Sequence, residues 1–292
     1  MAPSDHDLPP GIAARPLFES DLNSALALSR EAGWNQVAAD WRIFLELGSV
    51  ICLTRGDGPP IATAATLPYD GSFAWISTVL VTTAERRQGL ARWLMRHCIE
   101  ELLARKLVPV LDATPAGRTV YIGLGFCDCW PMHRLVSRLV RTPPAISNPV
   151  AVRALTAHDW PQVIAYDTAV FGAERSALLR RLADRMPNAA LVAERGGRIA
   201  GFLLGRDGRV MSQLGPLAAD DDAVASALLA QAIAVTSAPL TIDVPDRHAG
   251  LCDWLATLGF TAERLLTRMV YGTHAAFDDS ARLFAIAGPE LG

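Results

Sequence analysis

The fold is decided by the stretch Val79-Leu80-Val81-Thr82-Thr83-Ala84-Glu85-Arg86-Arg87-Gln88-Gly89-Leu90-Ala91, in which an apolar strand ends and an amphipathic helix begins. We place the strand end at Val81 and the helix start at Gly89–Leu90. A helix start exposes about four unpaired backbone N–H groups and the positive end of the helix dipole. Gly89 has no side chain to block a ligand, and Arg86 and Arg87 add positive charge. The stretch therefore predicts a cradle for a diphosphate.

Two motifs here resemble those of the GNAT superfamily of N-acetyltransferases. The family signature at this junction is Gln or Arg, two residues, Gly, one residue, then Gly or Ala, and Arg86-Arg87-Gln88-Gly89-Leu90-Ala91 fits it. Tyr121-x-x-x-Gly125-Phe126 follows a buried strand and a helical segment, as the family's second motif does. One departure is Thr83, where the family often has proline, and we expect it to affect loop stiffness more than binding.

The resemblance implies acetyl-CoA as co-substrate. The strand end would offer backbone groups to the pantetheine arm, and a backbone N–H there would polarise the thioester carbonyl. Tyr121 would lie near the coenzyme sulfur, where a phenol of pKa about 10 can protonate a departing thiolate. Alternatively, Tyr121 only packs beside Phe126. The coenzyme residues predicted in this way are Val79, Leu80, Val81, Arg86, Arg87, Gln88, Gly89, Leu90, Ala91, Thr114 and Tyr121.

The chain also repeats itself, which predicts two domains of one fold. Four short matches recur in the same order: Arg15-x-Leu17-x-x-x-Asp21 as Arg153-x-Leu155-x-x-x-Asp159, Ile61-Ala62 as Ile199-Ala200, Leu124-Gly125-Phe126 as Leu258-Gly259-Phe260, and Arg134 with Val136 as Arg268 with Val270. We expect Asp21 and Asp159 to cap helices. A proline-rich linker, 141–149, separates the halves.

We therefore predict tandem GNAT domains of α/β (α+β) class, each a mixed, mostly antiparallel sheet flanked by helices. The predicted domains are residues 11–145 and 149–273, followed by a tail, 274–292, that packs on a domain. Tandem bacterial GNAT proteins with a degenerate second half look like this chain. The second half has Asp220-Asp221-Asp222 where the first has its cradle, and Leu255 where a tyrosine would precede Gly259. Like charges repel, so we expect this half to have lost the coenzyme site.

The acceptor side is less clearly marked in the sequence. In this fold the loop between the first two helices usually walls the acceptor, and here it supplies two Trp and two amide side chains: Trp34, Asn35, Gln36 and Trp41. The alternative is that the two Trp are core residues and that Asn35 caps a helix.

A base must take a proton from an attacking ammonium. Asp112, at the end of a buried strand, is the best placed candidate, followed by Asp70 and Glu85, and water is an alternative. We interpret His97 and His133 as solvated or structural. Asp243 mirrors Asp112 in the second half, and we favour a structural role for it.

Composition narrows the function further. The 292 residues carry a net charge of −3 and are 51% hydrophobic, which fits a cytoplasmic globular protein and favours neither nucleic acid nor membrane as a partner. Five irregularly spaced cysteines predict free thiols and no metal site. We predict acetyl transfer to a primary amine of a small molecule or peptide by direct attack. The alternatives are a non-catalytic acyl-CoA sensor and an enzyme for longer acyl chains. The sequence leaves open the acceptor and the choice between monomer and homodimer.

Overall fold

The computed structural model describes residues 8–143 and 150–292. Their contacts divide the chain into two compact units, Met1–Leu111 and Asp112–Gly292. The predicted linker lies partly outside the described residues, because 144–149 are not among them. No helix in the described part is long and apolar enough to cross a membrane. The same residues contain no cluster of His, Cys, Asp and Glu that could bind a metal ion.

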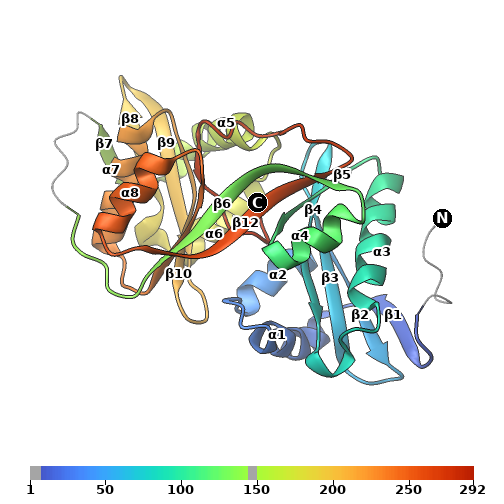
Figure 1. Cartoon of the computed structure of the whole chain (residues 1–292). Helices are drawn as coiled ribbons and strands as arrows, with labels where there is room; N and C mark the ends of the chain where they lie inside the picture. The colour runs from blue at the N-terminus through green and yellow to red at the C-terminus, as the bar shows by residue number, and fades with distance from the viewer. Residues whose placement is uncertain (1–7, 144–149) are drawn as a thin grey trace. The chain divides into compact units, whose positions relative to one another are not determined.

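The first unit is a sheet covered by three helices (Figure 1, blue to green). Its strands follow one another in chain order and are antiparallel up to β4, whereas β4 and β5 are parallel: β1 (Ile12–Pro16), β2 (Ser49–Arg55), β3 (Pro60–Pro68), β4 (Phe73–Val81) and β5 (Val108–Ala113, as far as Leu111). The helices pack on strands β2 to β4: α1 (Leu22–Glu31), α2 (Ala38–Leu47) and α3 (Leu90–Ala104). Large side chains such as Trp41, Phe44 and Trp75 fill the core.

The second unit repeats this order of elements. The strands that correspond to β1–β5 are β7 (Ala151–Ala154), β8 (Leu191–Arg195), β9 (Arg198–Arg206), β10 (Ser212–Ala219) and β11 (Leu240–Pro245). Its helices are α4 (Pro115–Ile122), α5 (Trp160–Phe171), α6 (Ser176–Arg185), α7 (Asp222–Val235) and α8 (Ala249–Thr257). The sheets are mixed and mostly antiparallel, as the sequence predicts.

The last strand of the first repeat is built into this second unit. β6 (Phe126–Ser137) pairs antiparallel with β11 on one edge and with β12 (Thr261–Tyr271) on the other. A strand from the first half of the sequence thus separates two strands from the second half. For this reason the compact units divide between Leu111 and Asp112, although the sequence repeat divides near the proline-rich linker.

Two buried ion pairs also join residues of the two repeats. Arg268, on β12, donates from Nε and Nη2 to the carboxylate of Asp112 at 3.0 Å each. Arg134, on β6, donates from Nε and Nη2 to Asp243 at 2.8 Å each. In the sequence these are equivalent residues of the two repeats, so each aspartate pairs with the arginine of the opposite repeat. The side chains of Asp112, Arg268 and Asp243 are fully buried.

The aspartates of the repeated Arg-Asp motif stand at the N-cap positions of α1 and α5 and form ion pairs. Arg15 donates to Asp21 at 2.7 Å, and Arg153 donates to Asp159 at the same distance. Neither carboxylate makes the side-chain bond of a cap to the helix that follows it. Each instead accepts the N–H of the residue three positions earlier, Phe18 or Thr156. Asp21 and Asp159 thus occupy the N-cap positions of α1 and α5, as expected, but their carboxylates close the preceding turn and do not bond to the helix.

Candidate functional site

The start of α3 has the geometry that the sequence predicts for an anion cradle. Gly89 stands at the N-cap with φ 82° and ψ 0°, in the left-handed region that favours glycine. A Cβ built on Gly89 would meet nothing within 4 Å, so the space beside it is open. No side chain caps the helix. Its first N–H groups are therefore available to a ligand.

The loop before α3 is tied down although it lacks the proline typical of the family. The carboxylate of Glu31, at the end of α1, accepts the Thr82 hydroxyl at 2.9 Å and the Thr83 backbone N–H. A proline at position 83 has no N–H and could not make the second bond. Arg86 Nε donates to the Val81 carbonyl at 3.2 Å, which fixes the turn from the other side. These hydrogen bonds lower the pKa of Glu31, so its carboxylate stays charged.

The remaining side chains of the loop include a hydrogen-bonded cluster around Glu85 and two exposed arginines. Gln88 Nε2 donates to Glu85 at 2.8 Å, and Arg55 makes a bidentate pair with the same carboxylate. The bond from Arg55 lowers the pKa of Glu85, which makes this carboxylate a poor proton acceptor. Arg86 and Arg87 are exposed at the surface. Two exposed arginines thus directly precede the uncapped helix start in the chain, which favours an anion there.

Strand β4 opens away from β5 just before this loop. The two strands pair over Phe73–Trp75 with Val108–Val110 only. Further along β4, Thr78 and Val79 lie opposite the single residue Ala64 of β3, which forms a β-bulge. Thr78 has φ 48°, an uncommon value for a β-branched residue. The bulge leaves one edge of Val79–Val81 free of pairing to β5 among the described residues.

The bulge also places two hydroxyl groups that the sequence analysis missed. Ser77 and Thr78 are 6% and 1% exposed, and neither hydroxyl has a hydrogen-bond partner among the described residues. Burying a hydroxyl without a partner costs free energy, so such groups mark strain or a ligand site. The available signal was two adjacent polar residues, Ser77-Thr78, inside an otherwise apolar strand.

Tyr121 lies on α4, in the second unit. Its ring packs against Phe126 at 6.1 Å between centroids, and its hydroxyl bonds to no described residue. Burial raises the pKa of this phenol above its ordinary value, so Tyr121 keeps its proton at neutral pH. Thr114 caps α4, because its hydroxyl accepts the Gly117 N–H at 3.2 Å. The Thr114 side chain therefore has a structural function of its own.

Comparison with known proteins decides the family. Residues 18–126 match the model of the acetyltransferase (GNAT) family, and residues 163–285 match a second model, described as an acetyltransferase (GNAT) domain. The chain is a tandem GNAT protein. It is therefore an acyltransferase of a family that uses acetyl-CoA as co-substrate.

The similar proteins match this chain over most of its length. An uncharacterized N-acetyltransferase of Bacillus subtilis, YitH, is 23% identical over 94% of this chain and 97% of its own length. Holothin acyltransferase of a Pseudoalteromonas species is 27% identical over 80% of this chain and 78% of its own. The crystal structure of a putative acetyltransferase from Pyrococcus horikoshii superposes with a TM-score of 0.80 at 20% identity, covering 97% of this chain and 96% of that one. This last likeness concerns the fold.

The second GNAT half closes its own helix start. Asp221 is the N-cap of α7, and its Oδ1 accepts the Val224 N–H at 3.0 Å. Arg195 pairs with the same carboxylate at 2.6 Å. Asp220 accepts the hydroxyl of Tyr166 at 2.8 Å. A carboxylate of the chain thus stands at the position where α3 of the first half is open.

Two of the predicted acceptor residues prove to be core residues. Trp41 is fully buried, and its Nε1 donates to Ser29 Oγ at 3.0 Å. Gln36 is 3% exposed and accepts from the same hydroxyl at 2.7 Å. This polar cluster holds α2 against α1. The Trp41 side chain is therefore not available to a substrate, whereas Nε2 of the buried Gln36 has no hydrogen-bond partner among the described residues. Trp34 and Asn35 are half-buried and keep their place as candidates.

Asp112, the predicted base with the best placement in the sequence, is not accessible to a substrate. Both oxygens of the Asp112 carboxylate accept from Arg268, and the pair is fully buried. Although burial raises the pKa of Asp112, an inaccessible and paired carboxylate cannot take a proton from a substrate. Asp70 is exposed. His133 bonds to Asp246 at 2.7 Å. Asp243 has the structural role that we favoured, because it is paired with Arg134.

A separate cavity of about 540 Å³ lies on the first unit, between strands β1 to β3 and helix α3. His97 lines this cavity and stacks on Trp93, with 5.2 Å between the ring centroids. None of the predicted coenzyme residues lines it. The cavity therefore does not belong to the predicted coenzyme site.

Proposed function

We propose that the chain transfers an acetyl group from acetyl-CoA to a primary amine, and that the first GNAT half binds the coenzyme. The observation that carries the proposal is the uncapped start of α3, with Gly89 in open space and two exposed arginines in the loop that precedes it. This arrangement fits a diphosphate, because bare backbone N–H groups, a helix dipole and arginines all favour an anion. Gly89, Leu90 and Ala91 would supply the backbone, and Arg86 and Arg87 the charge.

The free edge of β4 supports a place for the pantetheine arm. Val79, Leu80 and Val81 precede the cradle directly and lack a partner strand from β5. An extended chain of amides can bind such an edge as an added strand does. Ser77 and Thr78, whose hydroxyls lack partners among the described residues, precede this stretch in β4.

Coenzyme A supplies the acetyl group as an activated thioester. The acceptor nitrogen, in its neutral form, attacks the thioester carbonyl. An N–C bond forms, the C–S bond breaks, and the nitrogen then loses a proton to water, which balances the proton that the sulfur gains. Tyr121 would give its proton to the departing sulfur and regain one from water. Burial raises the pKa of its phenol, so the hydroxyl carries its proton at neutral pH, and it has no other partner among the described residues. With Asp112 and Glu85 held in ion pairs, we assign the removal of the ammonium proton to water.

One relative is named an N-acetyltransferase and the other an acyltransferase, so the length of the acyl chain needs its own test. We expect steady release of free thiol when the protein is given acetyl-CoA and a panel of primary amines that includes small amines, amino acids and peptides. Octanoyl-CoA, run in parallel, tests the longer donor. Binding of acetyl-CoA without thiol release on any amine would favour the sensor function over the enzyme.

A further inference from the structure

The second half contains an opening between strands like that between β4 and β5. β10 and β11 are parallel and pair only at Ser212 with Leu240 and at Gln213 with Thr241. A bulge in β10 follows, where its register against β9 shifts between Leu214 and Leu217. The two strands then part, as β4 and β5 do after Trp75.

A segment of the chain itself fills this second opening. Residues 282–287 include β13 (Leu283–Ala285), which pairs antiparallel with β10 through Leu217 and Ala218. On the β10 side, the Ala219 N–H donates to the Arg282 carbonyl at 3.0 Å. On the β11 side, the Ile286 N–H donates to the Asp243 carbonyl at 3.1 Å. The segment therefore bonds to both strands and lies between them.

The segment lies so close to β10 that β10 has a glycine, Gly215, at the point of contact. A Cβ built on Gly215 would lie 2.1 Å from the carbonyl oxygen of Ile286, which is an impossible contact. The side chains of the segment Leu283–Ala287 are at most 2% exposed. Glycine at position 215 is thus required by the presence of the segment. The segment is part of the core of the second half and not a loose end.

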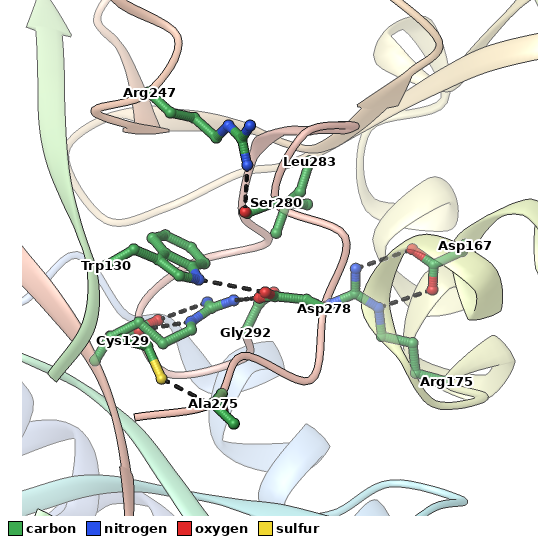
Figure 2. A network of polar contacts seen from close by, with 12 residues as sticks. Cys129, Trp130, Asp167, Arg175, Arg247, Ala275, Asp278, Ser280, Leu283 and Gly292 are labelled. Atoms are coloured by element: carbon green, nitrogen blue, oxygen red, sulfur yellow. Dashed lines mark hydrogen bonds and ion pairs between the residues drawn. The ribbon is translucent and has the colours of Figure 1, made fainter. Parts of the chain in front are cut away.

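Residues on either side hold the segment at its ends. His248 Nε2 donates to the carbonyls of Ser280 and Leu283 at 3.1 and 3.0 Å, and its ring stacks on Phe284. Burial lowers the pKa of His248, so the neutral ring keeps this role at pH 7. Figure 2 shows the wider network, in which Trp130 contacts Asp278, Arg247 contacts Ser280, and Arg175 contacts the Gly292 carbonyl.

We propose that residues 282–287 are a built-in occupant of the second coenzyme groove, so that each chain binds one coenzyme and the second half is a closed scaffold. The segment fills the opening between the strands, and Asp221 fills the helix start of α7. The proposal rests on the proposed function in one respect, which is that the coenzyme uses the corresponding opening of the first half. The filling of the second opening is a separate claim and is tested separately.

Hydrogen exchange of the full chain, measured by mass spectrometry, tests both claims in one experiment. Without ligand, we expect amides 283–287 to exchange at least ~100-fold more slowly than the exposed amides 274–276, because these residues are buried and the segment is paired with β10 and bonded to β11. Saturating acetyl-CoA should add protection at 79–91 and none at 212–225 or 282–287. Fast exchange of 283–287 without ligand, or a change there on adding acetyl-CoA, would overturn the proposal. A lack of added protection at 79–91 would instead contradict the proposed function.

A pair of proline variants gives an independent reading. Ile286→Pro removes the N–H that bonds to Asp243, whereas Ala276→Pro changes an exposed residue whose N–H bonds to no described group. We expect Ile286→Pro to lower the melting temperature by about 5 °C or more and Ala276→Pro by less than about 1 °C. Equal melting temperatures for the two variants would contradict the insertion of the segment. If Ile286→Pro does not fold, the exchange experiment on the unmodified chain still decides the question.

Discussion

Helices α3 and α7 begin at equivalent places of the two GNAT halves, but only α7 has a side chain that caps its first backbone N–H groups. At α3 the N-cap is Gly89, with open space beside it, no side-chain cap and two exposed arginines. At α7 the N-cap is Asp221, whose carboxylate accepts a helix N–H and pairs with Arg195. The same fold can thus present a helix start as a binding site or satisfy it internally, and one residue at the N-cap separates the two.

The same contrast extends to the neighbouring strands. In the first half β4 keeps an edge free of β5, and in the second half residues 282–287 cover the corresponding edge of β10. A helix start and a strand edge are both unsatisfied backbone, which must be bonded by the chain or by a ligand. The comparison therefore suggests which half is built to receive a ligand and which is complete without one.

We expect the largest effect on stability at the buried ion pairs that join the two repeats, Arg268 with Asp112 and Arg134 with Asp243. Arg268→Met should lower the free energy of unfolding by about 3–5 kcal/mol, because Asp112 would remain buried without its partner and Asp278 would keep, among the described residues, only the bond from Trp130. Arg134→Met should cost less, since Arg134 is 17% exposed and Asp243 keeps a bond from Gln213. Chemical denaturation of both variants measures the difference. An equal, small loss for both would show that the exchanged pairs do not hold the strands.

Substitution at the two helix starts tests the contrast between them. Gly89→Glu should raise the Kd for acetyl-CoA at least ~100-fold, because a carboxylate would stand where the diphosphate binds and the positive φ disfavours any side chain. Ala223→Glu adds the same charge to the exposed first turn of α7 and should leave this Kd unchanged. Calorimetric titration of both variants compares them directly. Loss of binding in Ala223→Glu would move the site to the second half.

Tyr121 has no counterpart in the second half, where Leu255 takes its place. Tyr121→Phe should lower kcat by about 10- to 100-fold and change the Kd of acetyl-CoA by less than about 2-fold, because only a proton transfer is lost. Because burial raises its pKa, the wild-type phenol should keep its proton, and kcat should hold, up to pH ~10. Steady-state rates from pH 7 to 10 measure both effects. An unchanged kcat in the variant would remove Tyr121 from the mechanism.

The smallest effect concerns the Arg-Asp motif that both halves share. Asp159→Asn should cost about 0.5–1 kcal/mol at pH 7, since its partner Arg153 is 40% exposed. Arg153 holds the pKa of Asp159 below its usual range, so this stabilisation is present above pH ~4, the unfolded pKa, and is lost as the pH falls through the folded pKa. Unfolding of both proteins at pH 7 and pH 3 checks the sign. A gap between them that widens in acid would contradict it.

Local features of the sequence predicted most of the fold. The repeated motifs, the apolar strand before Thr82 and the glycine before Leu90 report on short-range geometry, so they gave the tandem fold and the open helix start. The exchange of β6 into the second unit was not predictable, because strand pairing depends on residues far apart in the chain. The same limit applies to Trp41, whose burial depends on a partner in α1, Ser29.

The tail, residues 274–292, shows what a pattern of apolar residues can and cannot predict. Phe277, Leu283, Phe284 and Ile286 predicted that residues 274–292 pack on a domain, but an apolar pattern does not name the surface that it covers. Gly215 was the missing signal, since it stands in a strand at the point where another backbone passes. A single sequence does not show which backbone that is.

Titration of the full chain with acetyl-CoA by calorimetry tests the central claim most directly. The account predicts binding heat with one site per chain, which disappears when Ala91→Glu adds a carboxylate to the open first turn of α3. The absence of any heat, two sites per chain, or full binding by Ala91→Glu would contradict it.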